Sequence, residues 1–72
     1  MKADVILVTF DEKQNLVERK IGAVTVTRNT DLKDLFTKLA GKHFGKNFNV
    51  RSEPNLFKFC AVAPDGDCIV LR

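Results

Sequence analysis

The sequence is poor in the residues that build metal and cofactor sites. It has no tryptophan or tyrosine, one histidine and two cysteines. No second pair of ligands stands at metal-binding spacing beside Cys60 and Cys68, so we expect no metal site. No other pattern indicates a cofactor, and we find no catalytic constellation around a nucleophile. The sequence therefore predicts a protein that binds no cofactor and is not an enzyme.

The sequence also lacks a long apolar run. A membrane-spanning helix needs ~20 consecutive, mostly apolar residues, and no stretch of the chain approaches that length. The opening residues show no basic region followed by a long apolar stretch, which a secretory signal would have. We therefore expect a cytoplasmic protein, with the nucleus as an alternative compartment, and no contact with a membrane.

The residues that are present are typical of one small globular domain. Apolar residues make up 44% of the chain and charged residues 29%, with a formal net charge of +3. A chain this short buries only ~60% of the surface that its unfolded state exposes, so each large apolar side chain matters for stability. We expect a single domain over residues 1–72. Its mild positive charge permits an acidic partner without requiring one.

Two-residue alternation predicts a hairpin in the first part of the chain. Lys2–Phe10 is rich in β-branched residues and is predicted as a strand, followed by a polar loop at Asp11–Asn15. The chain then returns through Leu16–Arg28, in which Gly22 indicates a bulge or a close approach of backbones. Both faces of the first strand are partly apolar, as in a strand at the centre of a sheet.

Helical periodicity follows directly. Thr30 or Asp31 can accept hydrogen bonds from the free amides of a first helical turn, and Gly45 is the expected end. Apolar residues between these points fall on one stripe of an α-helix, namely Leu32, Leu35, Phe36, Leu39, Ala40 and Phe44. This stripe is wide enough to cover one face of a sheet.

The last part of the chain predicts a second hairpin. Pro64-Asp65-Gly66 has the residues of a tight turn, with strands at Leu56–Ala63 and Asp67–Arg72 on either side. The connection Lys46–Asn55 contains Pro54, which would stop a regular element there. The pattern leaves undecided whether a short extra strand forms in this connection. A three-residue loop would direct five apolar side chains toward the helix: Phe57, Phe59, Ala61, Ile69 and Leu71.

The same register places the two cysteines on the other face of this hairpin. Cys60 and Cys68 would then lie diagonally across the two strands, where Cα atoms usually stand beyond the ~7 Å limit of a disulfide. We therefore expect two free thiols. Their face would also carry Val62 and Val70, with Val5 and Leu7 as its possible extension.

The order of elements, the span VTVTRNTDLKDLFTKLAGKHF and the closing strand CIVLR resemble the ubiquitin-like β-grasp superfamily. The resemblance implies an α+β fold, a single small ubiquitin-like roll with the order β-β-α-β-β. It further implies a mixed four-stranded sheet packed on one helix, with the last strand parallel to the first in the middle of the sheet.

Two functions remain open. The leading hypothesis is a non-enzymatic interaction module that binds another protein through the sheet face away from the helix, because a monomer rarely exposes a large apolar patch. We expect this face to use Lys58, Cys60, Val62, Cys68, Val70 and Arg72.

The alternative is a small nucleic-acid-binding protein that uses the basic end of the helix, with Lys38, Lys42, Lys46 and Arg51. A homodimer formed by addition of edge strands also stays open.

Overall fold

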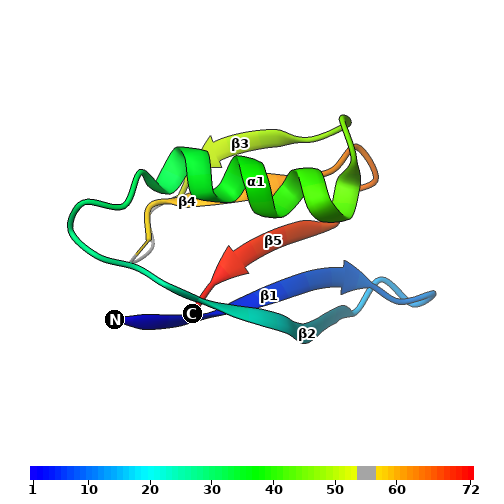
Figure 1. Cartoon of the computed structure of the whole chain (residues 1–72). Coiled ribbons are helices and arrows are strands. Elements are labelled where there is room, and N and C mark those ends of the chain that lie inside the picture. Colours follow the sequence, from blue (N-terminus) through cyan, green and yellow to red (C-terminus); the bar gives the residue numbers. More distant parts are fainter. Residues whose placement is uncertain (54–56) are drawn as a thin grey trace.

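The strands form one sheet in which every pair of neighbours runs antiparallel. A computed structural model describes residues 1–53 and 57–72 of the chain. Along the chain the elements are β1 (Lys2–Phe10), β2 (Leu16–Thr25), α1 (Leu32–Phe44), β3 (Asn49–Ser52), β4 (Phe59–Val62) and β5 (Cys68–Leu71). In space the strands follow the order β2-β1-β5-β4-β3 (Figure 1). The first and last strands are therefore neighbours at the centre of the sheet.

This topology confirms an α+β fold with one helix on one sheet and corrects the finer prediction. The sheet has five strands and not four, and β5 pairs with β1 in the antiparallel and not the parallel direction. The extra strand explains both differences. Because β3 adds one reversal of the chain between the helix and the last hairpin, β5 runs opposite to the direction that a four-strand order implies.

The first hairpin forms over the residues that alternation predicts. Its register runs from the pair Lys2 and Thr25 to the pair Phe10 and Leu16, with an irregularity opposite Val5 and Ile6. The irregularity falls directly beside Gly22, where a bulge was predicted: Gly22 pairs with Val5 and Lys20 with Ile6, so Ile21 is the extra residue. The loop closes through a hydrogen bond of 3.0 Å from the backbone amide of Asp11 to the carbonyl of Asn15.

The helix begins and ends at signals in its own sequence. A side-chain oxygen of Asp31 accepts a hydrogen bond of 3.1 Å from the backbone amide of Asp34, so Asp31 and not Thr30 caps the helix. Gly45, with a φ of 68°, follows the last turn in a conformation that glycine adopts without strain. Along its apolar stripe, Phe36 and Ala40 have no exposed surface.

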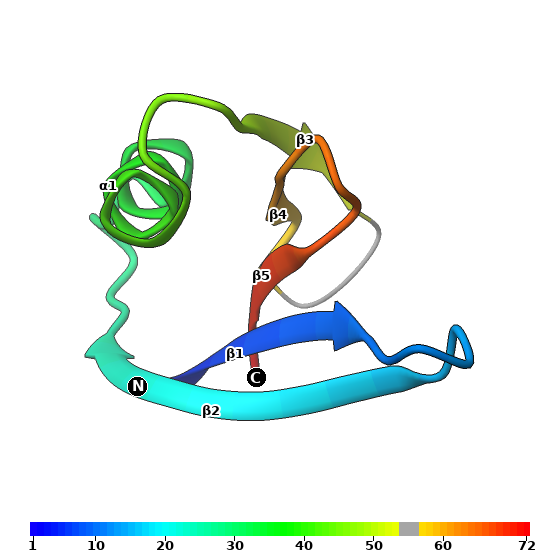
Figure 2. The same ribbon diagram turned by 90° about the vertical axis from the view of Figure 1, so that its right-hand side faces the viewer.

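The core lies between this stripe and one face of the sheet. Phe36 packs near Phe59, with a distance of 6.4 Å between ring centroids. All five side chains that were predicted to meet the helix belong to the core or pack against it: Phe57, Phe59, Ala61, Ile69 and Leu71. Figure 2 shows α1 beside one side of β5, with no helix on the other side. We call these sides the helix face and the outer face of the sheet.

The second hairpin is shorter than predicted. β4 and β5 pair with Ala61 opposite Ile69 and Val62 opposite Cys68, which is the predicted register. The predicted strand start at Leu56 and the break at Pro54 lie outside the described residues. The connection after the helix contains the short strand β3, which the sequence had left open.

Candidate protein-binding face

Strand register decides which apolar side chains lie on the outer face. Leu71 and Ile69 belong to the core, and they stand opposite Val5 and Leu7. Val5 and Leu7 therefore lie on the helix face, and the expectation that they extend the outer face is wrong. Their neighbours in β1 alternate to the opposite side. The outer face is apolar at Ile6, Val8, Phe10, Cys60, Val62, Cys68 and Val70.

Sequence reasoning missed Ile6, Val8 and Phe10 as outer-face residues. Alternation separates them correctly from Val5 and Leu7, but both sets are apolar, so the pattern itself cannot say which set faces the helix. Only the pairing with β5 settles it, since Ile6 stands opposite Val70 and Val8 opposite Cys68.

The outer face is closely packed at its centre and open around it. Cys60 and Val8 retain only 4% and 8% of their exposed surface. Ile6, Val62 and Val70 are half-buried, while Phe10 is 46% exposed. Cys60 thus offers little surface to a partner, and contact with this face would fall on the half-buried valines, Ile6 and Phe10.

The two cysteines are free thiols, as predicted. Burial raises the pKa of Cys60 to about 11, helped by the hydrogen bond of 3.5 Å that its thiol donates to the Glu53 carboxylate. Burial also raises the pKa of Cys68, and the charge of Asp67 adds to that rise. Because the thiolate is the reactive form, both side chains are poor nucleophiles near neutral pH.

Charged residues of β1, β2 and the end of β5 form pairs on the outer face. Arg72 joins the edge of β1 through two backbone hydrogen bonds with Asp4, of 2.7 and 3.0 Å, and its guanidinium pairs with Glu18. Lys20 forms an ion pair of 3.2 Å with Asp4. Lys58, which directly precedes β4, is exposed and has a positive φ of 64°. The predicted rim residues Lys58 and Arg72 therefore stand at the end of the sheet where β1 begins.

The structure separates the predicted nucleic-acid-binding residues. Lys38, Lys42 and Lys46 are all exposed at the C-terminal half of α1 and just beyond it, and Lys38 pairs with Asp34 at 3.1 Å. Arg51 stands opposite Cys60 and so lies on the outer face, away from the helix. Three lysines remain together, and Arg51 does not join them.

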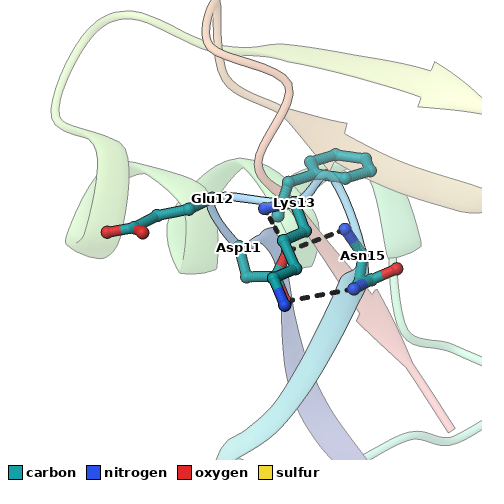
Figure 3. Close-up of a pocket in the computed structure, with 5 residues that line it drawn as sticks. Asp11, Glu12, Lys13 and Asn15 are labelled. Carbon is teal, nitrogen blue, oxygen red and sulfur yellow. Dashed lines mark hydrogen bonds between the residues drawn. The ribbon is translucent and has the colours of Figure 1, made fainter.

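A hollow open to solvent lies at the tip of the first hairpin, lined by Phe10, Asp11, Glu12, Lys13 and Asn15. The carboxylate of Asp11 is already occupied there. It accepts hydrogen bonds from the backbone amides of Asn15 and Lys13, of 2.8 and 2.9 Å (Figure 3). These bonds, the one from Asn15 foremost, lower the pKa of Asp11. The carboxylate therefore holds the loop together and is not directed at a ligand.

The described residues contain no group of three or more His, Cys, Asp or Glu side chains that could hold a metal ion. The single histidine, His43, is exposed in the last turn of α1. No helix among residues 1–53 and 57–72 is long and apolar enough to cross a membrane.

Comparisons with known proteins return no relative of this chain: no family model, curated protein or solved structure matches it. The resemblance to the ubiquitin-like superfamily therefore rests on the order of the elements. The antiparallel pairing of β1 with β5 departs from the parallel arrangement that this resemblance implies.

Proposed function

We propose that the chain is a non-enzymatic interaction domain that binds a partner protein through the outer face. One observation carries the proposal. Three neighbouring strands of the sheet, β1, β5 and β4, turn apolar side chains away from the helix, and no described helix lies over them. An apolar sheet face that no helix covers is typical of a protein–protein interface, where its burial supplies the driving force.

The two half-buried valines of this face, around its closely packed centre, are the expected contacts. Val62 and Val70 stand on β4 and β5 next to Cys68, and Ile6 and Phe10 continue the surface along β1. Lys58 and Arg72 stand at the rim, where charges set the orientation of a partner more than the strength of its binding.

Substitution of Val62 tests the proposal. Val62→Asp places a charge in the open part of the outer face, and Val17→Asp is the matched control. Val17 is also exposed, by 44%, but its pairing with Thr9 puts it on the helix-face side of the sheet. Each protein would be immobilised and used to capture partners from a cell lysate, with and without nuclease.

Proteins that the wild type and Val17→Asp retain and Val62→Asp loses, in both nuclease conditions, are the expected result. Capture that does not change with Val62→Asp, in a variant whose circular dichroism shows a folded protein, contradicts the proposal.

The alternative proposal is binding of nucleic acid by Lys38, Lys42 and Lys46. It is supported by the exposure of these three lysines around one end of the helix. Against it stands the negative end of the helix dipole, which repels phosphate at that place. Titration with an oligonucleotide at two salt concentrations decides it, because a complex held by phosphate contacts weakens steeply as salt rises. Absence of binding at low salt eliminates this alternative.

A further inference from the structure

Strand β3 forms one open edge of the sheet. Among the described strands it pairs only with β4, and Figure 2 shows it at the opposite end of the curved sheet from β2. In an antiparallel strand, residues that exchange backbone hydrogen bonds with the neighbour alternate with residues whose N–H and C=O groups point to the other side. An open edge therefore carries backbone donors and acceptors that a further strand can use.

One hydrogen bond fixes which residues of β3 face the open side. The backbone amide of Glu53 donates to the carbonyl of Lys58 at 2.8 Å, so these two residues form a bonded pair. Two positions back along the register, Arg51 therefore also bonds with β4. Val50 and Ser52 lie between the bonded positions and turn their N–H and C=O groups away from β4. These groups are in place to pair with an added strand.

The part of the chain that contains β3 is basic. Between Asp34 and Asp65 there is one carboxylate, that of Glu53, and it already accepts the hydrogen bond of the Cys60 thiol. The same stretch holds five cationic side chains: Lys38, Lys42, Lys46, Arg51 and Lys58.

Most of this positive charge has no partner within the chain. Lys38 pairs with Asp34, but Lys42, Lys46 and Arg51 form no ion pair within residues 1–53 and 57–72. Lys46 precedes β3, and Arg51 lies within it. An acidic segment along this edge would therefore meet cations that no described carboxylate neutralises.

The other open edge, that of β2, is less suited to an added strand. A bulge at Ile21 interrupts its ladder, and its middle carries charges of both signs, Glu18, Arg19 and Lys20. Bulges and mixed charges are devices that protect an edge strand from pairing. The edge of β3 has a regular register over its whole length.

We propose that the edge of β3 binds an extended, acidic segment of a partner protein as a sixth strand. Side chains of an added strand alternate between the two sides of the sheet. On the outer side they pass Arg51, which selects carboxylates. On the other side they pass Val50, which is half-buried and packs against the core, so apolar side chains fit there.

This inference goes beyond the proposed function, because it concerns the edge of β3 and not the outer face. Only two residues of β3 offer backbone groups, so pairing alone gives weak binding, and the charges supply the selectivity. A second copy of the chain does not fit this role. Two copies joined through β3 would bring their cations together, which opposes the pairing.

A synthetic peptide of alternating glutamate and valine tests the proposal. In a titration of the isotope-labelled chain at low salt, followed by NMR, the amide signals of Val50 and Ser52 should move most. Those of Glu18 and Lys20, on the edge of β2, should move little. Absence of binding at millimolar peptide, or shifts confined to β2, overturns the proposal.

Two control peptides separate strand pairing from simple charge attraction. A peptide with lysine in place of glutamate should not bind. The glutamate peptide methylated on every backbone nitrogen keeps its charge but has no amide donors, so it should bind at least about tenfold more weakly. Equal binding of the methylated peptide contradicts an added strand. A DNA oligonucleotide that moves the same two amide signals as strongly would show a general polyanion site and also contradicts it.

Ser52→Pro and its control Ser52→Ala test the open edge directly. Proline removes an N–H group that points away from β4, so the ladder within the sheet stays intact. The dissociation constant of the glutamate peptide should rise at least about fivefold in Ser52→Pro and stay unchanged in Ser52→Ala. Thermal melts check that both variants are folded. Equal affinity of the two folded variants overturns the predicted pairing.

Arg51→Glu tests the choice of an acidic partner and does not depend on the proline variant. Its matched control is Arg28→Glu, which makes the same change of net charge in the exposed loop before α1. The glutamate peptide should bind at least about tenfold more weakly to Arg51→Glu and with little change to Arg28→Glu. Equal weakening in both variants would mean that binding follows net charge alone, which overturns the assignment to β3.

Discussion

The two faces of the sheet start from similar side chains and end in different states. On the helix face, Ile69 and Ala61 have no exposed surface, because α1 covers them. On the outer face, their direct neighbours Val70 and Val62 are half-buried, although they are equally apolar. The comparison teaches that apolar alternation defines two faces, and that the position of a single helix decides which one becomes the core.

The two faces should differ most in how much stability the chain loses when a phenylalanine ring is removed from each. Phe36 is fully buried under the sheet, and Phe36→Ala should lower the free energy of unfolding by ~3–5 kcal/mol, since it leaves a cavity. Phe10 is 46% exposed, and Phe10→Ala should cost less than ~1.5 kcal/mol. Urea denaturation of both variants measures this. Similar losses in the two variants would show that the outer face is as closely packed as the core.

Adjacent residues of β4 offer the next comparison. Ala61 has no exposed surface, so Ala61→Asp buries an unpaired carboxylate and should cost ~3 kcal/mol or more. Val62→Asp, one residue later, keeps its carboxylate in contact with water and should cost no more than ~1 kcal/mol. Thermal melts of the two variants give the difference. If Val62→Asp unfolds the chain as Ala61→Asp does, the outer face is a second core and not a free surface.

The rates at which the two cysteines are alkylated compare the closely packed centre of the outer face with its open part. Cys60 is 4% exposed with a pKa of about 11, so we expect it to react with iodoacetamide far more slowly than a free cysteine at neutral pH. Cys68 is half-buried and should react faster than Cys60. Mass spectrometry of Cys60→Ser and Cys68→Ser isolates each thiol. Equal and rapid alkylation of both would contradict the burial of Cys60.

The same thiol gives the direction of a pH effect. The pKa of Cys60 is higher in the folded chain than its ordinary value of 9.0. Folding therefore favours the protonated thiol, which stabilises the fold fully below pH 9 and loses that contribution as the pH rises toward about 11. Chemical denaturation between these pH values should show a steeper loss of stability in the wild type than in Cys60→Ala. Identical pH profiles of the two proteins would exclude this contribution.

The smallest effect is expected from the charges of the outer rim. Glu18 pairs with Arg72, but both side chains are substantially exposed, at 41% and 60%. Exposed ion pairs contribute little, so Glu18→Gln should change the free energy of unfolding by less than ~1 kcal/mol. A loss of stability larger than that of Val62→Asp would mean that the rim holds the fold together.

Local signals in the sequence predicted the elements well. The bulge at Gly22, the cap at Asp31 and the turn at Pro64-Asp65-Gly66 each depend on residues close together in the chain, and each is present in the structure. Strand β3 was harder to predict, because Asn49–Ser52 contains one apolar residue and pairs with a strand that lies ten residues further along. Short polar strands gain their stability from the partner strand and carry no clear pattern of their own.

The candidate face was predicted only in part, for a related reason. Val62, Cys68 and Val70 were placed correctly because their register depends on a tight turn. Val5 and Leu7 were misplaced because their face depends on how β1 pairs with β5, at the other end of the chain.

Amino-acid order by itself determined the helix, both hairpins and the separation of each strand into two sets of side chains, since these follow from neighbouring residues through capping, turn geometry and alternation. Tertiary structure alone decided the direction of β5 against β1, and with it which apolar set meets the helix. The physical reason is that strands far apart in sequence pair in whichever direction the intervening reversals of the chain allow. Here β3 adds one such reversal, and the register of β1 against β5 places Val5 and Leu7 on the helix face and Ile6 and Val8 on the outer face.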